Sequence, residues 1–272
     1  MYETRNSKPS HSCAVWPFWL AALASTALGF CYVWWRGFHR MLRRNVSPRG
    51  GNELAFVGMR QLFRTAYSFL GPLEVRGQEN VPLIGGVIIA SNHTSDADVT
   101  VLYTALPRWA WFLGKEEIFS IPFLGKLIQY YHAFPIRRTG PADRVAMKQV
   151  LDLLQEGEAV VMFPEGKLAE DGRLQAFQPG TAMLAFKAGV RVVPAALDGV
   201  SKVVPYGEVY PRPIFQRVRV RFGPPIDLSD IPLDDRHERL AIATQRIRAG
   251  VIELVKEISP SSLSPEDLQP VV

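Results

Sequence analysis

Short runs of hydrophobic residues recur along the chain from about residue 72 onward, and stretches with helical periodicity separate them. Several of these runs are continuously apolar, as in strands that are covered on both faces of a sheet. Strands are predicted at Leu73–Arg76, Val87–Ala90, Ala110–Leu113, Ala133–Ile136, Ala159–Phe163, Val192–Leu197 and Val218–Phe222. Helices are predicted at Ala97–Ala105, Phe123–Tyr131, Ala142–Gln155, Thr181–Lys187 and Arg236–Glu257. This alternation predicts an α/β fold with a mixed, mostly parallel sheet flanked by helices.

A different pattern occupies the N-terminal part, where the 23 residues from Cys13 to Trp35 carry no charge. As a helix this run is long enough to cross about 30 Å of hydrocarbon, and its aromatic residues gather at both ends. A re-entrant hairpin that breaks near Gly29 or Arg36-Gly37 is the alternative. A cleaved signal peptide is disfavoured because the arginines follow the apolar run. Both a span and a hairpin predict membrane association.

The segment from Glu53 to Leu70 has apolar residues near helical spacing, with Arg60 and Arg64 four residues apart. This pattern suits a helix on an anionic membrane surface and equally a helix packed on the domain. The predicted organisation is an N-terminal tail, membrane-anchoring and interfacial helices, one α/β domain and a Ser/Pro-rich flexible tail, at residues 1–12, 13–70, 71–258 and 259–272.

The formal net charge of +5 first suggests a nucleic-acid partner. However, residues 1–49 carry +6, including five arginines directly after the apolar run, and the other 223 residues carry −1. The positive-inside rule then places the body of the protein on the cytoplasmic face of a membrane. Membrane lipids are therefore the expected surface partner, and nucleic acid is not.

Common signatures of nucleotide binding, serine hydrolysis and metal helices are missing from the sequence. One candidate pair remains, since His93 and Asp98 lie five residues apart where a predicted strand gives way to a helix. A neutral imidazole can accept a proton from an alcohol, and a carboxylate on its other nitrogen fixes the tautomer. Asp96 is the rival carboxylate. The pair alone also fits a helix cap beside a structural histidine.

Four sequence blocks in order resemble those of the glycerolipid acyltransferase family. They are Asn92-His93…Asp98, His132…Phe134…Ile136…Arg138, Phe163-Pro164-Glu165-Gly166 and Val193-Pro194. The resemblance implies that His93 is the general base and that Asp98 orients it. It also implies acyl transfer from acyl-CoA or an acyl carrier protein to the hydroxyl of a lysophospholipid, with no cofactor and no metal.

The resemblance implies that Arg138, Glu165, Gly166 and Lys167 bind the acceptor, for which 1-acyl-glycerol-3-phosphate is the first candidate and phosphatidic acid the product. The third block departs from the family pattern, because Lys167-Leu168 stands where Thr-Arg is usual. A phosphate-binding guanidinium is therefore missing at residue 168. Glycerol-3-phosphate or another lysolipid is the alternative acceptor. The intact His93 and Glu165 oppose a catalytically silent membrane scaffold.

Overall fold

The computed structural model describes residues 53–119, 133–136, 141–169, 171–208, 211–214, 216–231 and 235–268. The chain divides into Met1–Asn45 and Val46–Val272, and the described residues belong to the second unit. The apolar segment at 13–35, the helix predicted at Phe123–Tyr131 and Arg138 lie outside the described residues. Within the described ranges, no helix combines the length and the apolar character needed to cross a membrane.

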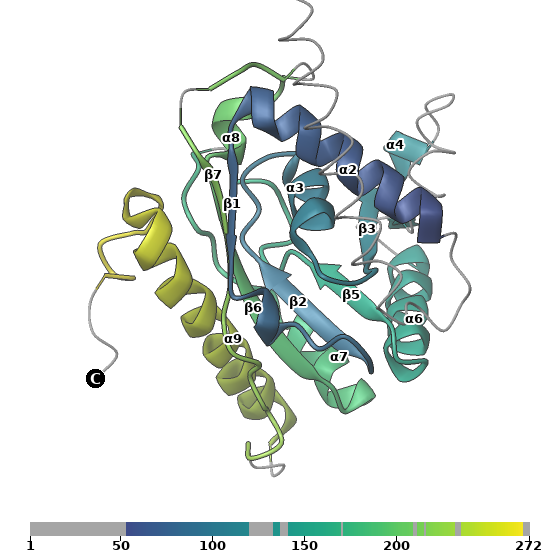
Figure 1. Ribbon diagram of the computed structural model, residues 1–272. Coiled ribbons are helices and arrows are strands. Elements are labelled where there is room, and N and C mark those ends of the chain that lie inside the picture. Colours follow the sequence, from purple (N-terminus) through teal and green to yellow (C-terminus); the bar gives the residue numbers. More distant parts are fainter. Residues whose placement is uncertain are drawn as a thin grey trace, which may run out of the picture. The chain divides into compact units, whose positions relative to one another are not determined.

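One sheet of seven strands forms the centre of the described fold (Figure 1). Its strand order is β1-β7-β6-β2-β5-β3-β4, and only the β6–β7 pair is antiparallel. The strands are β1 (Leu73–Arg76), β2 (Val87–Ser91), β3 (Trp111–Lys115), β4 (Ala133–Ile136), β5 (Ala159–Met162), β6 (Arg191–Asp198) and β7 (Val218–Phe222). Each predicted strand is present, and the predicted mixed, mostly parallel α/β sheet is confirmed.

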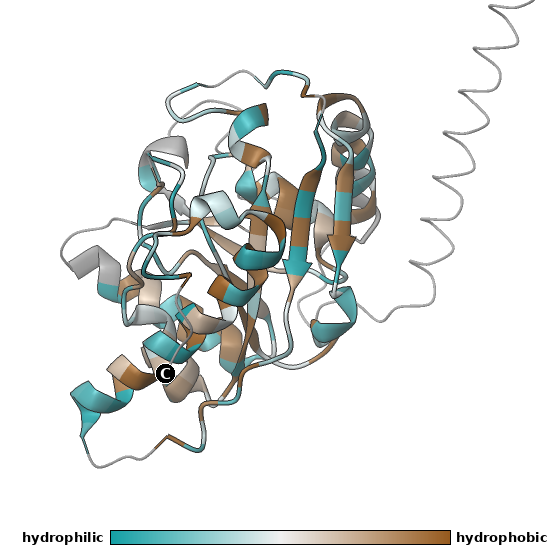
Figure 2. Ribbon diagram, turned by 90° about the vertical axis from the view of Figure 1, so that its left-hand side faces the viewer, coloured by the Kyte–Doolittle hydropathy of each residue, from teal (hydrophilic) through white to brown (hydrophobic). Residues whose placement is uncertain are grey.

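The hydrophobic pattern of each strand matches its place in the sheet. Every residue of β2 and β5 is buried, because helices cover both faces of the sheet centre. Next to the edge strand β1, β7 places Val218, Val220 and Phe222 in the core while its arginines point to the opposite face. The resulting alternation of apolar and polar residues along β1 and β7 is visible in Figure 2.

Helices pack on both faces of the sheet (Figure 1). Helices α2 (Glu53–Leu70) and α3 (Asp98–Ala105) contribute to one core cluster. The opposite face is covered by α6 (Pro141–Gln155), α7 (Gly180–Ala188) and α9 (Arg236–Ile258). Shorter elements are α4 (Glu116–Phe119), α8 (Val200–Val203), η1 (Gln78–Asn80) and η2 (Pro260–Ser262).

Helix α2 packs against the domain through its inner face. Phe56 stacks on Trp109 with ring centroids 4.4 Å apart, and the Tyr67 hydroxyl lies 2.7 Å from the Thr100 hydroxyl. The outer face carries Phe69, which is 77% exposed. Of the two roles that the sequence left open for this helix, the structure shows packing on the domain.

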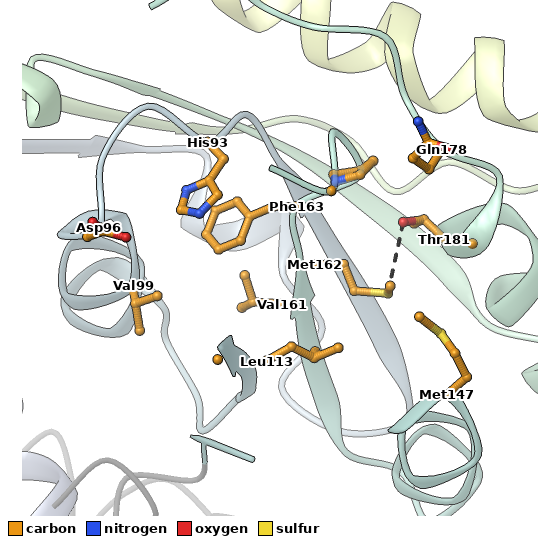
Figure 3. A pocket seen from close by; sticks show the side chains of 14 residues that line it. His93, Asp96, Val99, Leu113, Met147, Val161, Met162, Phe163, Gln178 and Thr181 are labelled. Carbon is orange, nitrogen blue, oxygen red and sulfur yellow. Dashed lines mark hydrogen bonds between the residues drawn. The ribbon is translucent and has the colours of Figure 1, made fainter. Parts of the chain in front are cut away.

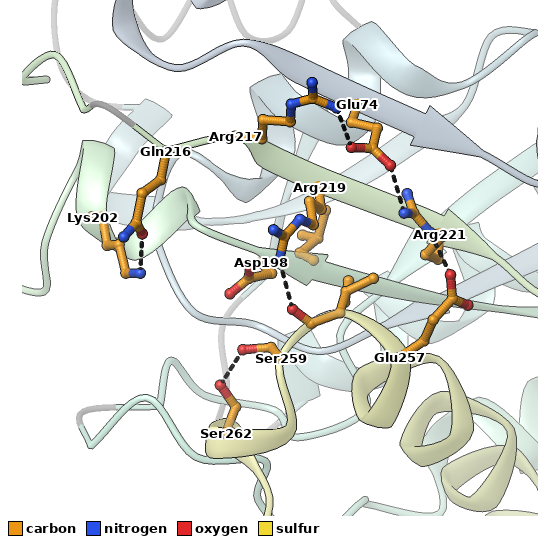
Figure 4. Close-up of polar contacts among 12 residues, drawn as sticks. Glu74, Asp198, Lys202, Gln216, Arg217, Arg219, Arg221, Glu257, Ser259 and Ser262 are labelled. Carbon is orange, nitrogen blue, oxygen red and sulfur yellow. Dashed lines mark hydrogen bonds and ion pairs between the residues drawn. The ribbon is translucent and has the colours of Figure 1, made fainter.

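An ion-pair network joins β1 and β7 to α9 (Figure 4). The Glu74 carboxylate of β1 accepts hydrogen bonds from Arg217 and Arg221, at 3.0 and 2.7 Å, and Arg221 also pairs with Glu257 of α9. These bonds, first from Arg217 and then from Arg221, lower the pKa of Glu74 to about 2. The network therefore fixes the short strand β1 beside β7 at any physiological pH.

The segment after α9 packs against that helix. Leu263 belongs to a core cluster with Val255 of α9, and the buried Asp267 carboxylate pairs with Arg248 at 2.7 Å. The sequence predicted a flexible tail from residue 259 onward. In the structure, residues 259–268 are instead held against α9 by apolar burial and an ion pair.

Candidate active site

His93 and Asp98 are brought together by the tight loop that joins β2 to α3. The His93 Nδ1 atom lies 3.0 Å from Asp98 Oδ2, and the Asp98 side chain is fully buried. An ionised carboxylate only accepts hydrogen bonds, so Nδ1 carries the proton and Nε2 keeps its lone pair. This tautomer is the one that a general base requires.

Further hydrogen bonds fix the orientation of the Asp98 carboxylate. Its Oδ2 atom also accepts the backbone N–H groups of Thr94 and Ser95, at 2.6 and 2.9 Å. The Thr94 hydroxyl donates to Oδ1 at 3.3 Å. These donors compensate for the burial of the charge. Asp98 is thus the carboxylate on His93, whereas Asp96 is exposed and lines the nearby pocket.

Two buried polar side chains hold this loop in place. The Asn92 carboxamide pairs with both backbone polar groups of Leu197 in β6, at 2.8 and 3.0 Å. The Ser95 hydroxyl donates to the Val204 carbonyl and accepts from the Ala97 N–H group. Asn92 matches the first sequence block, but its link to β6 was not predicted. Asn92 is buried and its carboxamide is fully hydrogen-bonded to the backbone, which indicates a structural role.

Glu165 follows β5 and contacts the loop of His93. Its Oε1 atom accepts the His93 N–H group at 2.8 Å, and Oε2 accepts the Gln175 N–H group at 2.9 Å. Burial raises the pKa of Glu165 to about 7, and the hydrogen bonds from the Gln175 and His93 N–H groups partly oppose this increase. The next residue, Gly166, has a φ of +72°, which turns the chain sharply after the carboxylate.

The raised pKa of Glu165 makes stability depend on pH. A carboxyl with a pKa of about 7 when folded and 4.5 when unfolded binds more protons in the folded chain. The contribution of Glu165 to stability is therefore largest below about pH 4.5 and is lost as the pH rises through 7. From pH 5 to 8, we expect the wild type to lose about 2.5 kcal/mol relative to Glu165→Gln. Urea unfolding of both proteins across this range measures the difference, and a constant difference would contradict it.

A mainly apolar pocket of about 220 Å³ opens beside His93 (Figure 3). The imidazole stacks on Phe163, with ring centroids 4.0 Å apart and an interplanar angle of 14°. The other lining residues are Asp96, Val99, Leu113, Gly114, Met147, Val161, Met162, Pro164, Gly166, Gln178, Gly180 and Thr181. These mostly apolar side chains suit the binding of an aliphatic group beside the His93 imidazole, which can accept a proton. In the described part of the chain, no group of three or more metal-ligating side chains gathers.

The candidate acceptor-binding residues differ in their position relative to the pocket. Gly166 lines the pocket, and Lys167 is exposed beside it. Glu165 is buried and is not among the lining residues, because both of its oxygens face backbone donors. Leu168, which stands in place of the family's arginine, is also buried. The predicted role of Arg138 falls outside the described residues.

The domain around the site is similar in sequence to known proteins. Residues 72–198 match the family model described as Acyltransferase, and this range contains His93, Asp98 and Glu165. The predicted resemblance to acyltransferases is confirmed over this range, which is a little under half of the chain.

Several curated relatives are 1-acyl-sn-glycerol-3-phosphate acyltransferases. The chloroplastic LPAT1 of Arabidopsis thaliana is 36% identical over 50% of this chain, but the match covers only 38% of that relative's length. The Bacillus subtilis relative is 29% identical over 70% of this chain and 92% of its own length. A crystal structure of the 1-acyl-sn-glycerophosphate acyltransferase PlsC from Thermotoga maritima shares the fold, with a TM-score of 0.62 at 23% identity over 80% of this chain and 86% of that chain.

Proposed function

We propose that this protein transfers an acyl group from a thioester to the free hydroxyl of a lysophospholipid, with His93 as the general base. The observation that carries the proposal is the position of His93 at an apolar pocket with its Nδ1 atom on a buried carboxylate. The family match and the names of the relatives support the same reaction. By that analogy, 1-acyl-glycerol-3-phosphate is the acceptor and phosphatidic acid the product.

The proposed reaction begins when His93 Nε2 removes the proton of the acceptor hydroxyl. The acceptor oxygen forms a bond to the thioester carbonyl carbon, and the carbon–sulfur bond then breaks. The proton on Nε2 passes to the departing thiolate, which leaves as the free thiol of CoA or of an acyl carrier protein. Asp98 stabilises the imidazolium during this cycle and stays ionised.

The apolar pocket is proposed to hold the acyl chain. An added Cβ at Gly180, the first residue of α7, would meet no atom within 4 Å. We expect Gly180→Val to narrow the pocket and to lower kcat/KM for long-chain donors about tenfold relative to short-chain donors. A donor series of increasing chain length tests this result. Gly58→Val, at an equally open glycine of α2, is the control, and an equal shift in both variants would contradict the assignment.

The phosphate of the acceptor headgroup needs a cationic partner. Arg138 is proposed to bind the phosphate, as a guanidinium matches its geometry, with Lys167 as a second cation. Leu168 is buried and uncharged, so the third block lacks its usual arginine. This difference keeps glycerol-3-phosphate or another lysolipid as the alternative acceptor.

The membrane is proposed as the source of the acceptor. The uncharged segment at 13–35 and the arginines after it suit an anchor that leaves the catalytic domain on the cytoplasmic face. Anionic lipids would attract this basic region toward the surface that holds the amphipathic acceptor.

An acceptor panel tests the proposed function. The purified chain in detergent micelles is given acyl-CoA or acyl carrier protein together with 1-acyl-glycerol-3-phosphate, glycerol-3-phosphate or a zwitterionic lysolipid. Thiol release and lipid product are both measured. We expect the highest kcat/KM with 1-acyl-glycerol-3-phosphate. A preference for another acceptor would select the alternative, and no acyl transfer to any acceptor would refute the function.

A further inference from the structure

Both backbone polar groups of His93 pair with the segment that follows β5. The N–H group donates to Glu165 Oε1 at 2.8 Å, and the carbonyl accepts the Ala169 N–H group at 3.1 Å. The imidazole also stacks on Phe163 of the same segment. The backbone of the proposed base is therefore held by residues more than 70 positions away in the sequence.

Glu165 joins this segment to a second loop, residues 171–178. Its Oε2 atom accepts the Gln175 N–H group at 2.9 Å, and the Gln178 N–H group donates to the Pro164 carbonyl at 2.8 Å. The side chain is only 4% exposed, so water does not replace these donors easily. One buried carboxylate thus connects the His93 loop with the 171–178 loop.

The segment after α9 holds the 171–178 loop from the other side. The Leu174 N–H group donates to the Ser262 carbonyl at 2.8 Å, and Leu174 shares a core cluster with Leu263. Within this segment the hydroxyls of Ser259 and Ser262 lie 2.8 Å apart (Figure 4). The Asp267–Arg248 ion pair fixes its far end to α9.

We propose that Glu165 is a positioning residue for His93, and that the segment at 259–268 supports it by holding the 171–178 loop. The proposal rests on the proposed function, in which His93 is the base. It replaces acceptor binding as the role of Glu165. A carboxylate presents an acceptor to both N–H groups, whereas a glutamine amide must turn its NH₂ group toward one of them. The resulting displacement of His93 weakens proton transfer but leaves the proposed acceptor-binding cations, Arg138 and Lys167, unchanged.

Steady-state kinetics of Glu165→Gln provide the first test. We expect kcat to fall about 30-fold while KM for the acceptor stays within about threefold, because the His93 geometry and not the binding site has changed. Glu158→Gln is the matched control: Glu158 is also fully buried, and it precedes β5 at the opposite end of the strand from Glu165. The control is expected to keep kcat. A large increase in acceptor KM with an unchanged kcat in Glu165→Gln would overturn the proposal in favour of acceptor binding.

An NMR measurement that does not depend on catalysis tests the positioning role of Glu165 independently of the proposed acyl transfer. The downfield NMR resonance of the His93 Nδ1 proton reports its hydrogen bond to Asp98. We expect this resonance to shift or broaden in Glu165→Gln and to be unchanged in Glu158→Gln. An unchanged resonance in Glu165→Gln would overturn the positioning role. A changed resonance in a protein that is inactive with every acceptor would refute the proposed function alone.

Asp267→Asn tests the contribution of the segment after α9. Loss of the ion pair with Arg248 is expected to lower kcat about threefold to tenfold with little change in KM, and to shift the same His93 resonance. Asp230→Asn removes the more exposed ion pair that Asp230 makes with Arg246 of α9 and is the control. A loss of thermal stability in Asp267→Asn without any change in kcat or in the resonance would overturn this second part of the proposal.

Discussion

Replacement of His93 by alanine is expected to lower kcat by about 10³-fold, within the 10²–10⁴-fold range of a positioned general base. The imidazole is 13% exposed and lines the pocket, so its loss removes the proposed proton acceptor and leaves a small polar cavity. Thiol release at saturating acceptor, followed over hours, measures the residual rate.

The fold is expected to tolerate this change. Asp98 keeps the N–H groups of Thr94 and Ser95 as hydrogen-bond donors in His93→Ala, so the melting temperature is expected to fall by only a few degrees. His93→Gln, which restores volume but supplies no base, is the matched variant and is expected to be equally inactive. Turnover within tenfold of the wild type in either variant would exclude His93 as the base.

Asp98→Asn is expected to reduce both activity and stability. His93, Thr94 and Ser95 all donate to Asp98 Oδ2, and a neutral amide oxygen in that position is a weaker acceptor than a carboxylate oxygen. The amide NH₂ group would also replace Oδ1 as the partner of the Thr94 hydroxyl. We expect kcat to fall by about 10³–10⁴-fold, because the imidazole loses its fixed tautomer. The free energy of unfolding is expected to fall by about 2–4 kcal/mol. Kinetics and urea unfolding measure the two effects.

The comparison variant for this prediction is Asp96→Asn. Asp96 is the other carboxylate near His93 in the sequence, but it is exposed and Asp98 occupies Nδ1. A greater loss of kcat in Asp96→Asn than in Asp98→Asn would contradict the assignment of Asp98 as the orienting residue.

The sheet was predictable from the sequence because strands that are buried on both faces consist of continuous apolar residues. Strands β2 and β5 are buried throughout: β2 begins with the apolar run Val87–Ala90, and β5 is the apolar run Ala159–Met162. The His93–Asp98 pair was predictable as well, since the end of such a strand followed by a helix brings residues five apart into contact. In both cases local sequence determines the feature.

The role of α2 could not be decided from its sequence. Apolar residues such as Phe56, at helical spacing, fit a lipid surface and a protein core equally well. The choice depends on Trp109 and Tyr103, which pack against Phe56 in the fold and lie about 50 residues further along the chain.

The contacts of Glu165 were also beyond the sequence. Its partners are the backbone N–H groups of His93 and Gln175, and every residue except proline has such a group. A motif therefore shows that a glutamate is present without showing what it contacts. The Ser/Pro-rich composition after α9 was similarly uninformative, because a few apolar residues such as Leu263 are enough to hold a short segment.

The position of β1 at the edge of the sheet has a consequence for synthesis of the chain. Leu73 pairs with Val218, which leaves the ribosome 145 residues later. At about 5–20 residues per second, β1 waits roughly 7–30 s for its partner strand. During this interval the partner strand β7 does not yet exist, so the apolar side chains of Leu73 and Val75 are not packed in the sheet. Nascent chains that stall before β7 are therefore the form of this protein most prone to aggregate and most dependent on chaperones.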